Sequence, residues 1–246
     1  PGASRAEILI FDQAKLESDP DAALVGDLWA RGAPVVQLTV SPLDDSLFAL
    51  MSNGHVLHWS SNSIREWVTG SVPRPDPVDR DAEVGDPQSM SVRYDGRWMV
   101  VADGAAPRLM VVNLAQFDAG GSPSNLLAEH LLPEDHSPSA VAFSYDGQLL
   151  YILCSESQML YRIEVRDNLD DFVPDIPAEG NTFSAVRLAD PEAENVSMPL
   201  DIGISPRDNW MYVLRRLFDD EGNPRDRGEI LILSIDAMNE RRGPDT

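Results

Sequence analysis

The sequence predicts an all-β protein, a β-propeller of four-stranded antiparallel blades, with about four recognisable blades and part of another. Two observations predict this fold. Four segments share one alternating pattern, and each of them runs into a tight turn and a second apolar strand. The segments are residues 35–42, 87–94, 138–145 and 199–206. Repetition at a spacing of about 50 residues, with several short strands in each repeat, is typical of propeller blades.

The first strand of each repeat alternates large apolar residues with small or polar ones, which is the period of a β-strand. Because the small set suits a position crowded by a neighbouring blade, we place these strands innermost in the ring. The large apolar set is expected to be buried between blades. It consists of Leu38, Val40, Met90, Val92, Val141, Phe143, Ile202 and Ile204.

The remaining strands follow from turn chemistry and apolar runs. Asp95-Gly96 and Asp146-Gly147 are strong hairpin signals, because these residues tolerate positive φ. Third strands are expected near residues 56–59, 109–112, 160–163 and 230–233, and weaker fourth strands near 64–68, 126–132 and 183–188. The chain is therefore predicted to be one propeller domain, residues 1–246, with blades near 35–70, 87–132, 138–188 and 199–236.

The amino-terminal residues 1–30 are expected to form the strands of a partial blade. Residues 7–12 resemble residues 229–234, a third strand, and residues 24–30 suit a fourth strand. Either these strands complete the last blade, or the chain is part of a larger propeller. Proteins avoid unpaired sheet edges, but completing the last blade would leave one third strand over, so we favour the second alternative.

Two segments carry a resemblance to a known family. Residues 143–152, with the sequence FSYDGQLLYI, and residues 204–213, ISPRDNWMYV, resemble the repeat of YVTN/lactonase-like and WD40-like propellers. The third strands lack the Trp-Asp ending of WD40 repeats, apart from a partial echo at Trp59, which favours the YVTN-like side. The resemblance implies the propeller fold and selects no activity, because such folds carry many functions.

Charge restricts the possible partners. The chain has 41 acidic and 19 basic residues and a formal net charge of -22. Such a surface repels nucleic acid and anionic lipid and favours a protein partner with a basic surface, or a cation. Solubility is the alternative explanation for the charge.

No apolar run is long enough to cross a bilayer, so no membrane insertion is expected. The preferred compartment is extracytoplasmic, periplasmic or secreted, although no signal peptide is visible. The single cysteine, Cys154, allows no internal disulfide and is expected to be a buried hydrophobic residue.

Candidate binding residues gather on loops that share one end of the ring. In an antiparallel blade, the interblade link and the turn between the second and third strands lie at the same end. We call this end the acidic face. Its candidate residues are Asp76, Asp79, Asp86, Asp103, Asp135, His136, Asp219, Asp220 and Glu221.

Two of the candidates suggest more specific chemistry. His136 follows Asp135, and a nearby carboxylate could hold and charge its imidazole. Asp201 is different from the loop acids, because it falls inside an innermost strand. A carboxylate there needs a hydrogen-bond donor, such as Arg215, or an ion.

No cofactor is predicted, because the sequence shows no Ser-His-Asp set, phosphate-binding glycine loop or CxxC motif. Calcium is the weak alternative, since oxygen-rich loops suit it better than zinc. The loop at Asp219, Asp220 and Glu221 lacks the spacing of an EF-hand.

The preferred function is a non-enzymatic scaffold that presents the acidic face for protein–protein interaction, as a subunit of a larger assembly. The alternative is a lactonase-like or related hydrolase with its site at the propeller axis. Such a site would be built from the aligned inner-strand positions Gln37, Ser89, Ala140 and Asp201.

Overall fold

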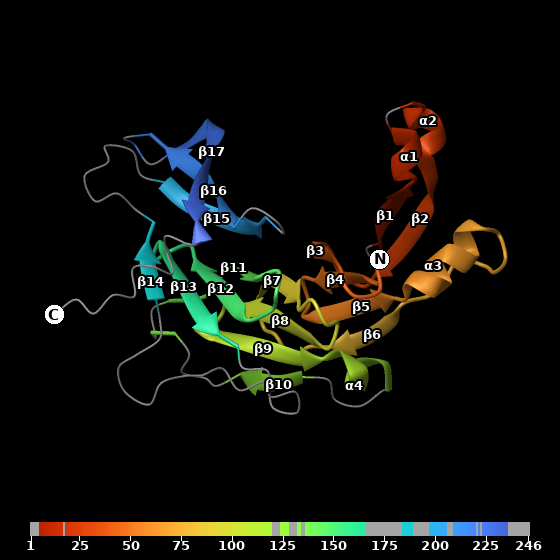
Figure 1. The fold of residues 1–246 in the computed structure, drawn as a ribbon, viewed down its shortest axis with the longest axis horizontal. Coiled ribbons are helices and arrows are strands. Elements are labelled where there is room, and N and C mark those ends of the chain that lie inside the picture. The colour runs from red at the N-terminus through yellow and green to blue at the C-terminus, as the bar shows by residue number, and fades with distance from the viewer. Residues whose placement is uncertain are drawn as a thin grey trace.

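The computed structural model describes residues 5–16, 18–119, 124–127, 132–133, 136–165, 184–188, 197–205, 209–219, 221 and 223–235. Five antiparallel sheets follow one another along an arc, and the predicted all-β architecture is thereby confirmed (Figure 1). Counting described strands, three sheets have four strands, one has three and one has two. No described strand joins the first sheet to the last, so the arc does not close into a ring within this part of the chain.

We call each sheet a blade and number the blades along the chain. The partial blade has strands β1 (Arg5–Phe11) and β2 (Leu24–Arg31). Blade I has β3 (Val35–Val40), β4 (Leu47–Met51), β5 (His55–Trp59) and β6 (Val78–Asp81). Blade II has β7 (Pro87–Val92), β8 (Trp98–Asp103), β9 (Arg108–Asn113) and β10 (Ser124–Leu127).

Blade III has β11 (Ala140–Phe143), β12 (Leu149–Cys154), β13 (Met159–Glu164) and β14 (Ser184–Arg187). Blade IV has β15 (Ser197–Ile204), β16 (Trp210–Phe218) and β17 (Pro224–Ser234). In the described part of the chain, four short helices lie in the connections: α1 (Gln13–Leu16), α2 (Pro20–Ala23), α3 (Ser61–Val68) and α4 (Leu114–Ala119).

The hairpins between first and second strands form as the turn chemistry predicts. Positive φ angles occur at Asp45 (59°), Gly96 (64°), Gly147 (66°) and Asn209 (50°), one in each of blades I to IV. These angles are those of the left-handed region, which Gly, Asn and Asp adopt most readily. The predicted spacing of first and second strands therefore rests on local turn preferences.

One predicted strand is wrong. Residues 64–68 belong to helix α3, which begins after Ser60, whose hydroxyl accepts a hydrogen bond from the Ser63 amide at 3.2 Å. The fourth strand of blade I is β6, which pairs with β5. Asp79 and Asp81 therefore lie on a strand and not in the link to blade II.

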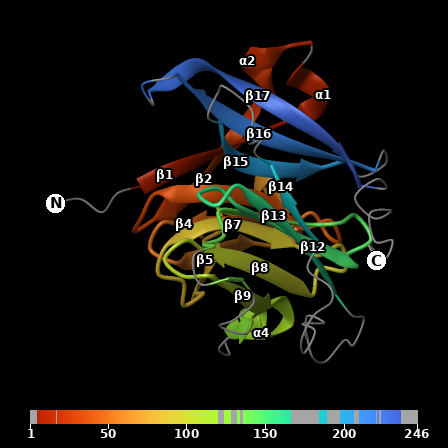
Figure 2. The ribbon, with the colours of Figure 1, turned by 90° about the vertical axis from the view of Figure 1, so that its left-hand side faces the viewer.

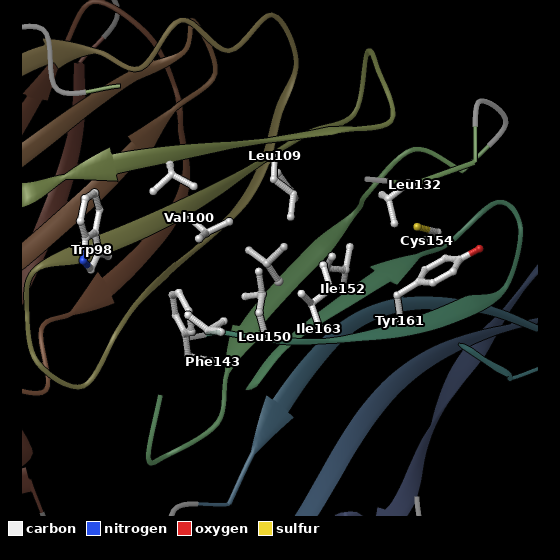
Figure 3. Close-up of a cluster of buried hydrophobic side chains, with 14 residues drawn as sticks. Trp98, Val100, Leu109, Leu132, Phe143, Leu150, Ile152, Cys154, Tyr161 and Ile163 are labelled. Carbon is white, nitrogen blue, oxygen red and sulfur yellow. The ribbon is translucent and has the colours of Figure 1, made fainter. Parts of the chain in front are cut away.

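Neighbouring blades stack face to face and bury the core between them. Between blades II and III, Phe143 and Leu150 pack in one cluster with Val100 and Trp98 (Figure 3). Cys154 lies in the same cluster, and burial raises the pKa of its thiol to about 12. The cysteine is therefore a buried apolar residue, as the sequence predicts.

The small polar set of the inner strands forms hydrogen bonds between blades. The amide of Val141 donates to the Ser89 hydroxyl at 3.3 Å, and the amide of Phe143 donates to the Ser91 hydroxyl at 3.1 Å. The Met90 amide donates in the same way to the side-chain oxygen of Gln37. Each such bond joins a side chain of one inner strand, on the side that faces the next blade, to a backbone amide of the next inner strand.

The large apolar set is buried in blades II and III, buried or half-buried in blade IV, and exposed in blade I. Met90, Val92, Val141, Phe143 and Ile202 are buried, and Ile204 is half-buried. In blade I, by contrast, Leu38 is 44% exposed and Val40 54% exposed, so their predicted burial is wrong.

The reason for this exposure lies in the preceding sheet. The partial blade contributes only two strands, and β2 runs into β3 as the fourth strand of each later blade runs into the next inner strand. The two strands therefore hold the third and fourth positions, and they pack on β4 and β5. No described strand lies opposite β3 on that side.

The opposite end of the arc also shows an apolar face. Tyr212, Leu214, Ile230 and Ile232 are exposed on one side of blade IV, where Tyr212 pairs with Ile232 and Leu214 with Ile230. Figure 2 looks at this end of the arc, with β15, β16 and β17 side by side.

Replacement of Gly147 by Ala is expected to destabilise the protein by roughly 1–3 kcal/mol more than replacement of Gly70. Gly147 and Gly70 both have a left-handed φ, 66° and 75°, so alanine should introduce a similar backbone strain at either position. An added Cβ at Gly147 would lie 2.4 Å from Cδ1 of Tyr94 and 2.8 Å from Nε of Arg93, whereas nothing lies within 4 Å at Gly70. Urea unfolding of both variants gives the comparison, and equal losses would contradict the crowding at the blade II–blade III contact.

Candidate functional site

The interblade links and the turns between second and third strands lie together, as the prediction of the acidic face requires. The Ala82 amide, in the link after blade I, donates to the carbonyl of Gly54 in a turn of the same blade at 3.1 Å. The Gly104 amide donates to the carbonyl of Asp86 at 2.8 Å. These backbone bonds fix the loops on which the candidate carboxylates stand.

The carboxylates between residues 76 and 86 are exposed. Asp86 lies in the link, and Asp79 lies on β6, where its carboxylate is 2.8 Å from Nδ1 of His55. Asp81 accepts a hydrogen bond from the Glu83 amide at 2.7 Å. The segment thus holds its acidic side chains at the surface in fixed backbone positions.

Asp76 precedes β6, in the connection between the third and fourth strands, and the first residue of β6, Val78, is opposite His58 in the antiparallel pair. Asp76 therefore lies at the same end as the turns between first and second strands, and its predicted place on the acidic face is wrong.

The two arginines of this segment are directed elsewhere. Arg74 forms an ion pair with Asp27 at 2.8 Å and lies over the ring of Trp29, 4.0 Å from its centroid. Arg80 donates from Nε to the carbonyl of Phe117 at 3.1 Å. These contacts tie Arg74 to the partial blade and Arg80 to α4.

Asp103 does not belong to the exposed surface, which corrects its place among the binding candidates. Its side chain is fully buried and accepts hydrogen bonds from the amides of Gly85 (3.4 Å), Asp86 (3.0 Å) and Ala105 (3.1 Å). Nε of Arg108 also donates to it at 2.6 Å. Asp103 therefore holds the link to the β8–β9 turn and is not available to a partner.

The environment of Asp103 also sets its acidity. Burial raises the pKa of its carboxyl, but the hydrogen bonds from Arg108 and from the main-chain amides outweigh that effect, so the pKa lies below its ordinary value. The group is therefore ionised at neutral pH and holds its donors as a carboxylate.

The loop between β16 and β17 of blade IV is held by hydrogen bonds from its own backbone amides. Asp219 accepts from the backbone amides of Asn223 (2.8 Å) and Glu221 (3.0 Å), and these bonds lower the pKa of its carboxyl. Glu221 is exposed, and Asp220 lies outside the described residues. Among the residues that the structure describes, no group of three or more His, Cys, Asp or Glu side chains could hold a metal ion.

His136 is fixed to blade III. Its Nδ1 is within hydrogen-bonding distance of the Tyr161 hydroxyl, and its carbonyl accepts from the Cys154 thiol at 3.6 Å. Asp135, its predicted partner, lies outside the described residues. The contacts that are seen give His136 a structural role in closing the link onto blade III.

Asp201 is exposed on the outer side of blade IV, and its predicted pairing with Arg215 is wrong. The Ile202 amide donates to its carboxylate at 2.8 Å. Arg215 instead donates to the Ser197 hydroxyl and lies 3.9 Å from Glu229. Pro199 and not Asp201 is opposite Arg215 in the sheet, because the register shifts at this point.

The structure also forms a pocket that the sequence does not predict. It has a volume of about 250 Å³, lies between blades I and II, and includes Asp44, Phe48, His58, Arg97 and Phe117 among its lining residues. The rings of His58 and Phe48 stack at 4.5 Å, and Phe117 meets His58 edge-on. These residues come from distant positions in two blades, so no sequence spacing connects them.

The carboxylate of Asp44 in this pocket is fixed by its own turn. The hydroxyl and amide of Ser46 donate to it at 2.7 Å and 3.2 Å. Burial raises the pKa of Asp44, but hydrogen bonds from Ser41 and Ser46 and the nearby His58 lower it more. The Asp44 carboxylate in the pocket is therefore ionised, and residues of its own turn donate hydrogen bonds to it.

Comparison with solved structures defines the fold further. The chain resembles hydrazine synthase of Kuenenia stuttgartiensis with a TM-score of 0.50, at 15% identity, over 80% of this chain and 49% of the other. It resembles the dihydro-heme d1 dehydrogenase NirN with a TM-score of 0.53, at 14% identity, over 89% of this chain and 40% of the other. Both are β-propeller-type proteins. The fold of this chain is propeller-like.

This similarity shows the fold alone, since both identities are low. The chain spans about half or less of the length of these two structures. No family profile and no curated protein matches the sequence. In the described part of the chain, no helix has the length and apolar character needed to span a membrane.

Proposed function

We propose that this protein is a non-enzymatic, YVTN-like β-propeller scaffold whose acidic face binds a protein with a basic surface, as a subunit of a larger assembly. The observation that carries the proposal is the exposed set of Asp79, Glu83 and Asp86, on β6 and on the link that backbone hydrogen bonds hold. Fixed charges on a rigid frame suit recognition of a complementary surface, because few degrees of freedom are lost on binding.

The arginines support this proposal. Arg74 and Arg80 contact Asp27 and the Phe117 carbonyl, so the positive charge within the segment is used in holding blade I to its neighbours. The exposed carboxylates then contribute to the potential outside the protein. Complementary charge of this kind raises the association rate more than it strengthens the final complex.

The alternative of a hydrolase site at the axis gains no support from the described side chains. Gln37 and Ser89, which would contribute to such a site, accept amide hydrogen bonds from the next blade. Ala140 has no functional group, and Asp201 faces outward at the end of the arc. The structural neighbours include a synthase and a dehydrogenase, but at this identity the likeness does not extend to activity.

Reversal of two charges on the acidic face is expected to slow association several-fold at low salt, with a smaller change in dissociation. The variant is Glu83→Lys with Asp86→Lys, and the probe is an immobilised arginine-rich peptide. Added salt should weaken the effect, because exposed charges are screened beyond about 8 Å at physiological ionic strength. Surface plasmon resonance at two ionic strengths measures both rates.

The matched control changes the same net charge at the other end of the blades. Asp45, in a first–second turn, and Glu66, in α3, are both exposed, and both would be changed to Lys. The control should slow association much less than the test variant. If both variants slowed it equally, net charge alone would explain binding and the proposed face would have no special role.

A further inference from the structure

The pocket between blades I and II lies at the end of these blades where first strands turn into second strands. Residues of both turns and of helix α4 line it. Phe48, Leu114 and Phe117 are buried and belong to the apolar cluster that joins the two blades. The buried ring of His58 stacks on Phe48 and meets Phe117 edge-on. The pocket therefore has an apolar, largely aromatic floor.

Two charged side chains of opposite sign stand at the exposed rim of the pocket. Asp44 belongs to the turn of blade I and Arg97 to the turn of blade II, and both are exposed. Trp98, the residue after Arg97, packs toward blade III, so alternation along the chain directs Arg97 to the other side, toward blade I. Within the described part of the chain, no ion pair joins Asp44 to Arg97. The rim therefore offers one negative and one positive group to a molecule in the pocket.

A second carboxylate of the lining, that of Asp95, is already engaged. Asp95 is half-buried, and its carboxylate lies 3.6 Å from Nη1 of the buried Arg93. It also accepts a hydrogen bond from the Arg97 amide at 3.1 Å. Ser46, by contrast, donates to Asp44 only through neutral groups, its hydroxyl and its amide, so the Asp44 carboxylate keeps its negative charge. Recognition of a charged ligand therefore rests on Asp44 and Arg97.

A ligand that matches this arrangement has an apolar group at one end and two opposite charges at the other. A free α-amino acid with an apolar side chain is such a molecule, because its ammonium and carboxylate groups are bonded to the same carbon atom. Arg97 suits the carboxylate, because a guanidinium donates two parallel hydrogen bonds to one carboxylate. The volume of about 250 Å³ is below the roughly 300–1,000 Å³ of sites for drug-sized molecules, so the pocket suits a ligand of this smaller size.

We propose that the pocket between blades I and II binds a free α-amino acid with an aromatic side chain. The ring of the ligand enters the pocket and packs on Phe48, His58 and Phe117, in the offset and edge-on arrangements that aromatic groups prefer. The ammonium group of the ligand lies at Asp44 and its carboxylate at Arg97. The site is at the opposite end of the blades from the acidic face, so it does not rest on the scaffold function.

Three ligands of similar size separate the contributions of the two charges. Phenylalanine has both charged groups, phenethylamine lacks the carboxylate, and 3-phenylpropionate lacks the ammonium group. Because the charges at the rim are exposed, each ion pair with the ligand should contribute modestly. We expect the Kd of phenylalanine to be about three- to tenfold lower than that of either analogue. Equal Kd values for phenylalanine and phenethylamine would overturn the proposal, because Arg97 would then make no contact with the ligand.

Charge variants of the full chain test the two contacts by isothermal titration calorimetry at physiological ionic strength. Asp44→Asn should weaken the binding of phenylalanine and phenethylamine about three- to fivefold and should not weaken that of 3-phenylpropionate. Arg97→Gln should weaken the binding of phenylalanine and 3-phenylpropionate by a similar factor and should not weaken that of phenethylamine. A variant that only disturbed the fold would affect all three ligands alike, so the absence of this crossed pattern would overturn the proposal.

A bulky residue in the lining tests the position of the ligand's ring. Ala115 is an exposed residue of α4 that lines the pocket, so Ala115→Trp should abolish phenylalanine binding. The matched control is Gln116→Trp, at the next residue of the helix, which is exposed and does not line the pocket. It should bind phenylalanine as the wild type does, and both variants should keep the wild-type melting temperature.

No saturable binding of phenylalanine to the wild type, or equal binding by the two tryptophan variants, would contradict the proposed site. The variant that carries Glu83→Lys and Asp86→Lys should bind phenylalanine normally, because its changes lie on the acidic face. This comparison separates a failure of the amino-acid site from a failure of the scaffold function.

Discussion

Replacement of Phe143 by Ala is expected to lower the free energy of unfolding by roughly 3–5 kcal/mol. Phe143 is buried between blades II and III, in one cluster with Trp98, Leu150 and Ile152 (Figure 3). Removing its ring leaves a cavity at the inner end of that interface, which the strands on both sides cannot fill without breaking their ladders. Urea unfolding measures the loss, and a value below about 1 kcal/mol would contradict the packing described here.

The control compares one residue type at one position of successive blades. Val92 is buried against blade I, whereas Val40 is 54% exposed at the equivalent place in blade I. Val92→Ala is expected to cost roughly 1–3 kcal/mol, and Val40→Ala less than about 0.5 kcal/mol. Equal losses would show that something covers β3 in solution.

The strand pattern could be predicted from the sequence because it depends on neighbouring residues. Large and small side chains alternate along β7 and β11, and an Asp-Gly turn follows each of them. The positive φ of Gly96 and Gly147 is a property of the turn itself. Because the pattern repeats, a weak strand or turn pattern in one blade could be recognised by its alignment with a strong pattern in another blade.

At helix α3 the repeat led to a wrong prediction of secondary structure. Ile64, Trp67 and Val68 have the spacing of one helical face, and Ser60 is a good N-cap residue. The repeat nevertheless predicted a fourth strand at this distance from the third. In blade I this helix is inserted between the third and fourth strands. The longer connection places the fourth strand later in the chain than the repeat predicts.

The burial of a residue could not be predicted from the sequence where it depends on a neighbouring sheet. Leu38 and Met90 have the same pattern around them, and only the number of strands in the preceding blade decides which of them is covered. Asp86 and Asp103 both looked like loop acids. Asp103 is buried because amides of the link and the side chain of Arg108 converge on it from two sides of the turn.

Asp103→Ala is expected to lower the free energy of unfolding by roughly 3–5 kcal/mol, because it removes one partner of a buried charged contact. The amides of Asp86 and Ala105 would lose their acceptor, and Arg108, which is 2.6 Å from the carboxylate through both Nε and Nη2, would lose its counter-ion. Unpaired buried donors are costly. Asp86→Ala is the matched control, since the Asp86 side chain is exposed, and it should cost less than about 0.5 kcal/mol.

The pH dependence of Asp103→Asn tests the same contact. The folded-state pKa of Asp103 lies below its ordinary value, so the contact stabilises the protein above the unfolded pKa, near 3.9. This contribution is lost as the pH falls through the folded pKa, because the carboxyl is then protonated in both states. The stability difference between wild type and Asp103→Asn should therefore be largest at about pH 6 and shrink below about pH 4. Urea unfolding across this range measures it, and a difference that stays constant from neutral to acid pH would show that the charge of Asp103 does not hold the link.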